Sequence, residues 1–308
     1  MTTGKLSRRF ALAAGLSSLM WPQTAWPRPE DREVEGGIGG TGIVGILTEF
    51  GSLIVSGNRV ETDLRTEFSG PFGPLSESDI RVGDSLTIEA LGSAGNLRAR
   101  RVHVTYPLVG TVSERAPGGR QLTVNGVTVL TEAGAPLPSV GDRVAVSGLW
   151  RDDEVVASRL SLVSGTLDLV SGDVLRTARG IRIGPVSTRG RGLVSRSNGS
   201  FATAIGRFDA DRGILRATDI TTARFTGAAG ALARLSIEGY LTRSPTAPGY
   251  RIAGLGHSFE RNLDLQKYAE ARVLFNGAYT GRFAAESAVI LPDNVSARQR
   301  VLRRLANG

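Results

Sequence analysis

Short stretches that alternate hydrophobic and polar residues recur along most of the chain. The clearest occupy residues 82–89 and 140–147, and each alternates as a strand with one buried face should. A second alternating stretch follows each of them, at residues 97–104 and 155–162, so each pair predicts a β-hairpin. Glycine and proline, 40 and 13 residues respectively, recur between short apolar runs, as turn residues do in all-β proteins.

The same arrangement occurs about four times, which predicts an internal repeat. Each copy opens with a first hairpin that begins at a glycine, and these glycines are Gly45, Gly110, Gly165 and Gly239. The pair Asn125-Gly126 between alternating apolar residues is the strongest hairpin signal in the chain. Weaker copies of the second hairpin pair residues 200–206 with 214–220, and 271–275 with 283–291.

Small sheets with so few strands avoid open edges by closing into a barrel. We therefore predict an all-β protein of about four tandem small OB-like antiparallel β-barrel units, with an N-terminal signal segment and a short C-terminal helix. The predicted boundaries are 1–25 for the signal segment, 26–40 for a flexible linker, 41–105, 106–163, 164–228 and 229–292 for the repeats, and 293–308 for the basic helix. Repeats 3 and 4 are the divergent copies. Neighbouring units stacked in a row would form a rigid rod.

Two glycine-rich stretches carry a resemblance to a known family. Residues 36–45, Gly-Gly-Ile-Gly-Gly-Thr-Gly-Ile-Val-Gly, and residues 50–60, Phe-Gly-Ser-Leu-Ile-Val-Ser-Gly-Asn-Arg-Val, resemble domain of unknown function 5666. The likeness is specific over residues 36–104 and fair over 108–163, and it rests on pattern alone beyond about residue 165. Members of that family are exported bacterial proteins with tandem small β-barrels. The resemblance implies export and an OB-like fold, and it implies no activity.

The N-terminus has the pattern of an export signal. Arg8 and Arg9 follow Ser7 and precede an apolar run that ends at Met20, which is too short to span a membrane comfortably. The arginine pair resembles a twin-arginine signal. Cleavage after Ala25 would leave a periplasmic or cell-envelope protein, and an uncleaved N-terminal membrane anchor is the alternative. No later stretch approaches 18 consecutive apolar residues, so no further transmembrane span is expected.

Composition narrows the possible chemistry. The formal charge is +8 and becomes +5 without the first 25 residues, which hold one lysine, two arginines and no acid. The absence of cysteine excludes disulfides and thiolate metal sites, and with two histidines we predict no metal site and no cofactor. Gly37, Gly39 and Gly42 match a dinucleotide fingerprint by letter, but that motif requires a preceding strand and a following helix. A flexible lead-in to the first barrel is the expected role.

The candidate ligand-binding residues are arginines of repeat 3. No acid occurs between Asp173 and Asp209. Seven arginines fall there: Arg176, Arg179, Arg182, Arg189, Arg191, Arg196 and Arg207. Clustered guanidinium groups could hold an anionic envelope polymer such as a polysaccharide, lipopolysaccharide phosphate or nucleic acid. A solvated basic surface is the alternative interpretation.

Histidine and aspartate offer weaker candidates. Gly256-His257-Ser258 resembles a nucleophile elbow, but Glu260 stands where that motif needs glycine. His103 lies in an alternating stretch, where a surface or interface histidine is expected. Asp84 and Asp142 each follow a glycine at matching places in two repeats, which indicates turn residues.

Three functions remain open from the sequence. The favoured one is an exported, non-enzymatic envelope protein with an interaction or structural role, whose partner is another envelope protein or an anionic polymer. The second is a binding module for an anionic oligomer, and the third is a hydrolase that uses His257 and Ser258. The C-terminal helix, expected at about residues 295–306, either docks on the last barrel through Leu302 and its neighbours or touches an anionic membrane.

Overall fold

The alternating stretches form strands whose apolar side chains fill the interiors of small barrels. A computed structural model describes residues 39–93, 95–132, 136–193, 199–243, 250–252, 263–292 and 294–307. In β6 (Ser85–Ser93), Leu86 and Ile88 are buried in the core of the first repeat, and Val102 and Val104 of β7 (Asn96–Val104) face them there. The signal segment, with Arg8 and Arg9, lies outside the described residues.

Repeat 1 is a closed five-stranded barrel. Its strands are β1 (Gly40–Glu49), β2 (Leu53–Val55), β3 (Asn58–Glu61), β6 and β7. They pair in the order β1-β2-β3-β7-β6 and back to β1, and the β3–β7 pair alone is parallel. Between β3 and β6 lie the short strands β4 (Glu67–Gly70) and β5 (Gly73–Pro74) and a 3-10 turn at Glu77–Asp79. This strand order is that of an OB-type barrel, as predicted.

Repeats 2 and 3 close in the same order. Repeat 2 consists of β8 (Leu108–Arg115), β9 (Gln121–Val124), β10 (Val127–Leu130), β11 (Arg143–Arg151) and β12 (Glu154–Leu162). Repeat 3 consists of β13 (Asp168–Thr177), β14 (Gly180–Ile183), β15 (Val186–Arg189), β16 (Phe201–Asp209) and β17 (Ile214–Thr221). The interiors of both barrels form one hydrophobic cluster.

Repeat 4 keeps part of this plan. Its strands are β18 (Leu232–Gly239), β19 (Thr242–Arg243), β20 (Tyr250–Arg251), β21 (Arg272–Tyr279) and β22 (Phe283–Leu291), with a 3-10 turn at Leu265–Tyr268. β18 pairs with β21, β21 with β22, and β19 with β20, but no pairing among the described residues closes the barrel. The first strand ends at Gly239, so the expectation that this copy begins at that glycine was wrong.

Matching turns show that the first two repeats are copies of one unit. Ser56 and Gly57 have φ of 52° and 70°, and Asn125 and Gly126 have 52° and 73°, so both two-residue hairpins use the left-handed region twice. The carboxylate of Asp84 accepts a hydrogen bond from the backbone N–H three residues earlier at 2.8 Å, and Asp142 does the same. Both aspartates are turn residues, as predicted.

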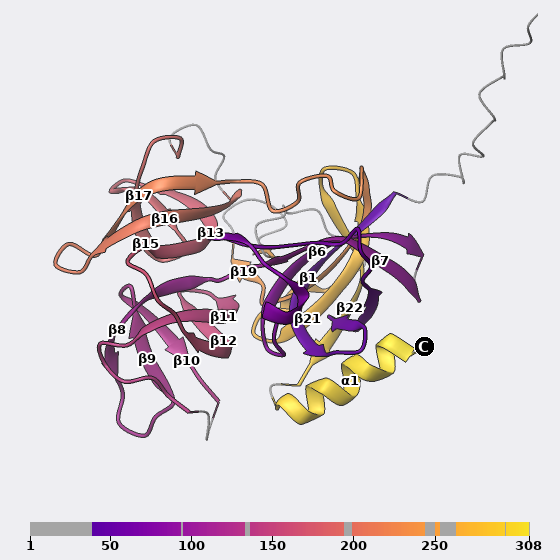
Figure 1. Ribbon diagram of the computed structural model, residues 1–308, viewed down its shortest axis with the longest axis horizontal. Helices are drawn as coiled ribbons and strands as arrows, with labels where there is room; N and C mark the ends of the chain where they lie inside the picture. Colours follow the sequence, from indigo (N-terminus) through magenta and orange to yellow (C-terminus); the bar gives the residue numbers. More distant parts are fainter. Residues whose placement is uncertain are drawn as a thin grey trace, which may run out of the picture. The chain divides into compact units, whose positions relative to one another are not determined.

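The repeats do not form a rod, because the chain returns from repeat 4 to repeat 1. β1 pairs in parallel with β18, with Gly42 opposite Leu235 and Val44 opposite Ile237. β8 pairs with β13 and joins repeats 2 and 3. Figure 1 shows repeats 2 and 3 on one side and repeats 1 and 4, with the C-terminal helix, on the other. Residues Ile38–Gly308 form a single compact unit.

The glycines at the start of β1 have a packing role, whereas the sequence predicted only a flexible lead-in to the first barrel. Gly40 and Gly42 lie inside β1. A Cβ at Gly42 would lie 2.5 Å from Leu235 and 2.8 Å from the ring of Phe225, and a Cβ at Gly40 would lie 2.7 Å from the carbonyl oxygen of Ala229. Glycine at these positions lets repeat 4 approach the first strand closely.

The C-terminal helix α1 (Val295–Asn307) docks on the body of the protein. Leu302 is fully buried with Leu274 and Leu291 of repeat 4, and Leu305 contacts Gly57 of repeat 1. The docking prediction is therefore confirmed. Within the part of the chain that is described, no helix has the length and apolar character needed to cross a bilayer.

Candidate functional site

A cavity of about 260 Å³ lies where the four repeats meet. Repeat 1 contributes Ser85, repeat 2 contributes Trp150, repeat 3 contributes Asp173 and repeat 4 contributes Arg251. Arg224, from the segment that connects repeats 3 and 4, also lines the cavity. The pairing of β1 with β18 brings the last repeat back to the first at this cavity.

Trp150 of β11 forms one wall of this cavity and also packs against the hydrophobic cluster of repeats 2 and 3. Its indole N–H donates a 2.6 Å hydrogen bond to the carbonyl oxygen of Ser171, across the boundary between repeats 2 and 3. A Cβ at Gly172 would lie 3.0 Å from the indole nitrogen, and one at Gly184 would lie 3.2 Å from the ring. The two glycines therefore leave the space that the indole occupies.

Arg251 is a deeply buried charge of the cavity, with a side chain only 4% exposed. One terminal nitrogen lies 3.6 Å from a carboxylate oxygen of Asp173, which is an ion pair without a short hydrogen bond. Among the described residues, no acceptor bonds its Nε. A side chain at Gly199 would collide with this guanidinium, and the φ of +82° there also favours glycine.

Arg224 is the second guanidinium at the cavity. Its central carbon lies 3.7 Å from the centre of the Phe201 ring, which is the geometry of a cation–π contact. Its Nε is buried and, within the described part of the chain, has no hydrogen-bond partner. Burial lowers the pKa of Arg224 to about 10, while the charge of Asp173 acts in the opposite direction.

Asp173 is the carboxyl that faces both arginines. Burial raises the pKa of Asp173 to about 6, although Arg251 and Arg224 each favour its ionised form. Two attractive charges normally lower a carboxyl pKa, so the loss of water outweighs them here. At pH 7 the three groups together carry one uncompensated positive charge.

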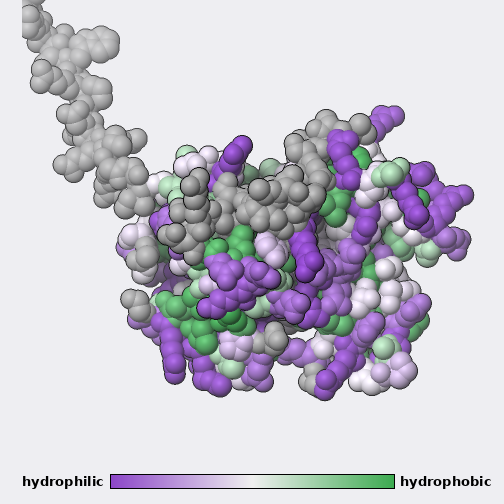
Figure 2. Space-filling model, turned by 180° about the vertical axis from the view of Figure 1, so that it is seen from behind, coloured by the Kyte–Doolittle hydropathy of each residue, from purple (hydrophilic) through white to green (hydrophobic). Residues whose placement is uncertain are grey.

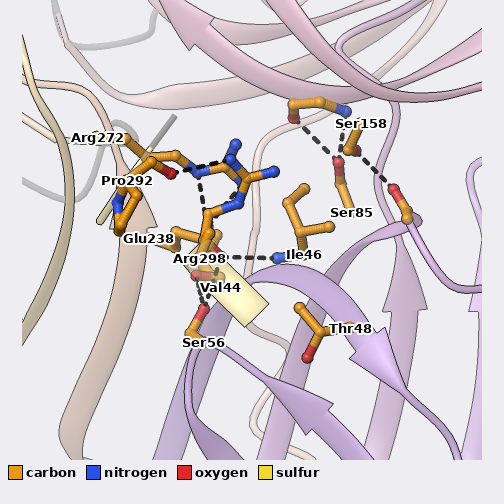
Figure 3. A network of polar contacts seen from close by, with 12 residues as sticks. Val44, Ile46, Thr48, Ser56, Ser85, Ser158, Glu238, Arg272, Pro292 and Arg298 are labelled. Atoms are coloured by element: carbon orange, nitrogen blue, oxygen red, sulfur yellow. Dashed lines mark hydrogen bonds and ion pairs between the residues drawn. The ribbon is translucent and has the colours of Figure 1, made fainter. Parts of the chain in front are cut away.

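A buried network beside the cavity holds repeats 1 and 4 together (Figure 3). Glu238, fully buried, accepts hydrogen bonds from Arg272 at 2.7 Å, from the backbone N–H of Ile46 at 3.1 Å and from Ser56 at 3.4 Å. On the other side of the cavity, Ser85 exchanges two hydrogen bonds with the backbone of Gly148 at 2.7 and 3.0 Å. These contacts fix the walls from both sides.

A family described as Domain of unknown function (DUF5666) matches residues 41–103 and 109–161, which are the barrels of repeats 1 and 2. The match covers these two repeats and does not extend into repeats 3 and 4. No curated protein and no solved structure matches the chain. The two matched repeats supply one part of the cavity wall. Outside the matched segments, repeat 3 supplies Phe201 and Asp173, and repeat 4 supplies Arg251.

The arginines predicted as a ligand site lie mostly away from the cavity. Five of them are exposed: Arg176, Arg179, Arg189, Arg191 and Arg207. Arg182 forms an ion pair with Asp153 at 3.1 Å, and Arg196 lies outside the described residues. Strand register brings Arg189 and Arg207 alongside Arg216, one on each of three neighbouring strands. We call these three side chains the outer arginine row.

The histidine candidates do not form a catalytic group in the described structure. His103 is half-buried in β7 and hydrogen-bonds Ser69 at 2.9 Å. Burial lowers its pKa to about 4, helped by the charges of Arg101 and Arg224, so it is neutral at pH 7. His257 and Ser258 lie outside the described residues. Across the described ranges, no group of three or more potential ligands could hold a metal ion.

Sequence reasoning missed the residues that line the cavity. Arg251 and Arg224 sit in stretches without a strong pattern, and Asp173 served only to mark the start of the acid-free region. One signal was present in Trp150, because the other two tryptophans, Trp21 and Trp26, lie near the N-terminus. A single tryptophan in a body of alternating strands could have been identified as a wall of a pocket.

Proposed function

We propose that this protein is an exported, non-enzymatic binding protein whose central cavity holds a small anionic molecule. The observation that carries the proposal is the Arg251 guanidinium, which is 4% exposed and has a buried Nε without an acceptor among the described residues. A buried donor left unpaired costs about 1–3 kcal/mol. A bound anion would satisfy this donor and the matching Nε of Arg224.

The chemistry of the cavity favours binding over catalysis. Guanidinium groups stay protonated in proteins and do not serve as general bases. Asp173 is engaged with both arginines, and Glu238 accepts three hydrogen bonds and forms an ion pair with Arg272. Export rests on the Arg8-Arg9 pattern and the apolar run that follows it.

The test is a fluorescence titration of the full chain. In a Trp21→Phe/Trp26→Phe background, Trp150 is the remaining tryptophan and reports directly on the cavity. We expect a saturable change with at least one of three probes: sodium acetate, sodium benzoate and sodium phosphate. Arg251→Gln should weaken that binding at least about tenfold.

Two variants control this titration. Arg300→Gln removes an exposed arginine of α1 and should leave binding unchanged. Arg224→Gln provides a second test of the site should Arg251→Gln fail to give the native circular dichroism spectrum. The proposal is wrong if no probe saturates, or if folded Arg251→Gln or Arg224→Gln protein binds as the parent does.

The outer arginine row supports a second candidate function, binding of an anionic oligomer on repeat 3. Arg189, Arg216 and Arg207 are cross-strand neighbours on β15, β17 and β16, and Asp209 bonds Arg216 at 3.1 Å. Replacing all three by glutamine should lower the salt needed for elution from heparin, because each phosphate-like contact releases counterions. An unchanged elution point would remove this candidate.

A further inference from the structure

We infer that the ligand of the central cavity is a small aromatic monocarboxylate, with its carboxylate on Arg251 and Arg224 and its ring between Trp150 and Phe201. This inference rests on the proposed function and specifies its ligand. Three independent properties of the cavity lead to it: its volume, its aromatic walls and its charge balance.

The volume of the cavity suits a ligand of about one ring and a small substituent. The cavity measures about 260 Å³. An apolar cavity of roughly 150 Å³ in another protein is large enough for benzene. The remaining volume suits a carboxylate group, and the cavity is smaller than the roughly 300–1,000 Å³ of pockets for drug-sized ligands.

The walls provide flat apolar surfaces next to the charges. Trp150 and Phe201 both line the cavity, together with Leu86, Leu149 and Leu175. The indole is fixed by its hydrogen bond to Ser171 and the phenyl ring carries the Arg224 guanidinium on its face. An aromatic ligand can stack or pack edge-to-face on such rings, which strengthens binding beyond the effect of area burial.

The charge balance calls for one negative charge. Arg224 and Arg251 oppose Asp173, which leaves one positive charge. Of the other charged residues of the lining, Glu238 and Asp153 form ion pairs with two arginines from outside the lining, Arg272 and Arg182. The last two, Asp152 and Arg243, are exposed and carry opposite charges. A monoanion would neutralise the cavity. A dianion such as phosphate would leave an excess negative charge beside Asp173, which is unfavourable because like charges repel.

A carboxylate also matches the donors by shape. Each guanidinium presents a planar fork of N–H groups, and a carboxylate accepts two parallel hydrogen bonds from such a fork. The Nε atoms of Arg224 and Arg251 are two of the buried donors without partners among the residues described, and both residues line the cavity. The ligand would therefore use donors that the protein leaves unsatisfied, without displacing an existing hydrogen bond.

The experiment is a competitive series read by Trp150 fluorescence in the full-length Trp21→Phe/Trp26→Phe chain. The probes are benzoate, acetate, benzyl alcohol, phthalate and phosphate. We expect benzoate to bind at least about tenfold more tightly than acetate, which lacks the ring, and than benzyl alcohol, which lacks the charge. Phthalate and phosphate should be weaker than benzoate.

Phe201→Leu separates the ring contact from the charge. It removes the aromatic face under Arg224 and keeps both arginines, so it should weaken benzoate severalfold while acetate binding stays the same. Arg251→Gln should remove binding of both benzoate and acetate, and Arg300→Gln should change the binding of neither ligand. A folded Phe201→Leu protein that binds benzoate as tightly as the parent would contradict the aromatic site.

The outcomes also separate this inference from the proposed function. If acetate or phosphate binds more tightly than benzoate, the cavity binds anions but the aromatic class is wrong. If benzyl alcohol matches benzoate, the arginines do not select the charge and both proposals fail. If no probe saturates, both fail as well.

Discussion

The guanidinium and carboxyl groups of the cavity should make anion binding depend on pH. Asp173 has a folded-state pKa of about 6 because burial disfavours its ionised form. A bound carboxylate adds a negative charge beside it and raises that pKa further, so the complex holds the proton more tightly than the free protein. Because protonation of Asp173 and binding of the carboxylate are linked, the affinity for the ligand should rise as the pH falls toward about 6, by at most about tenfold per pH unit. Below about pH 6 the affinity should level off.

Benzoate titrations at pH 8 and pH 6 check this expectation. Asp173→Asn removes the titrating group and should bind with the same affinity at both pH values. An affinity that decreases toward pH 6 in the parent protein would contradict the assigned role of Asp173. The neutral His103, whose pKa is about 4, should not contribute over this range.

Single residues show where sequence reasoning succeeded and where it stopped. Asp84 and Asp142 were predictable as turn residues, because their chemistry is local to four residues. The pairing of Asp173 with Arg251 was not predictable, because 78 residues separate the two and the partner depends on how repeats 3 and 4 meet. The arginine-rich appearance of repeat 3 pointed to exposed side chains and missed the buried guanidinium groups.

The C-terminal helix α1 acts at the scale of an element as a strap across repeats. Its Leu302 packs with Leu274 and Leu291 of repeat 4, Arg303 pairs with Glu49 of repeat 1, and Arg298 lies 3.6 Å from Glu132 of repeat 2. Burial lowers the pKa of Arg298, with the charge of Arg272 acting in the same direction. The helix therefore contacts three repeats at once.

We expect Leu302→Ala to lower the free energy of unfolding by about 2–5 kcal/mol, because it leaves a cavity under the helix. Leu305→Ala is the matched control, since Leu305 is 43% exposed on the same helix. This variant should lower the free energy of unfolding by about 1 kcal/mol or less. Urea unfolding of the full chain measures both. Equal effects would mean that α1 is not held by its buried face.

At the scale of elements, the hairpins were predictable because alternation and the Asn125-Gly126 turn are local signals. The incomplete closure of repeat 4 among its described residues was not predictable, because it depends on pairings between distant strands.

Hydrophilic side chains dominate the face in Figure 2, with hydrophobic groups in smaller patches between them. The large exposed apolar residues lie far apart in the sequence, from Phe50 to Leu305.

The whole molecule depends on the contact that returns repeat 4 to repeat 1. Glu238 of β18 is fully buried and bonds both Arg272 in its own repeat and the backbone of β1. Alternation predicts that β1 is a strand, but not that its second edge pairs with a strand about 190 residues later. The expected rod failed for this reason, since a row of barrels and a closed group of barrels have the same sequence periodicity.

Glu238→Ala should lower the free energy of unfolding by about 3–5 kcal/mol, because it leaves the charge of Arg272 buried and uncompensated. Glu286→Ala is the control, because Glu286 forms an ion pair with Arg234 in the same repeat and is 43% exposed. That pair should contribute less than about 1 kcal/mol. Comparable losses in the two variants, measured by denaturant unfolding, would contradict the role of Glu238 as the link between repeats.

The central claim is that four repeats enclose one site for a small aromatic carboxylate. A crystal structure of the full chain with 4-bromobenzoate tests it most directly, because anomalous scattering locates the bromine independently of the protein atoms. We predict a bromine peak in the cavity between Trp150 and Phe201, with the carboxylate on Arg251 and Arg224. A cavity that stays empty at a saturating concentration, or a bromine peak elsewhere on the protein alone, would contradict the claim.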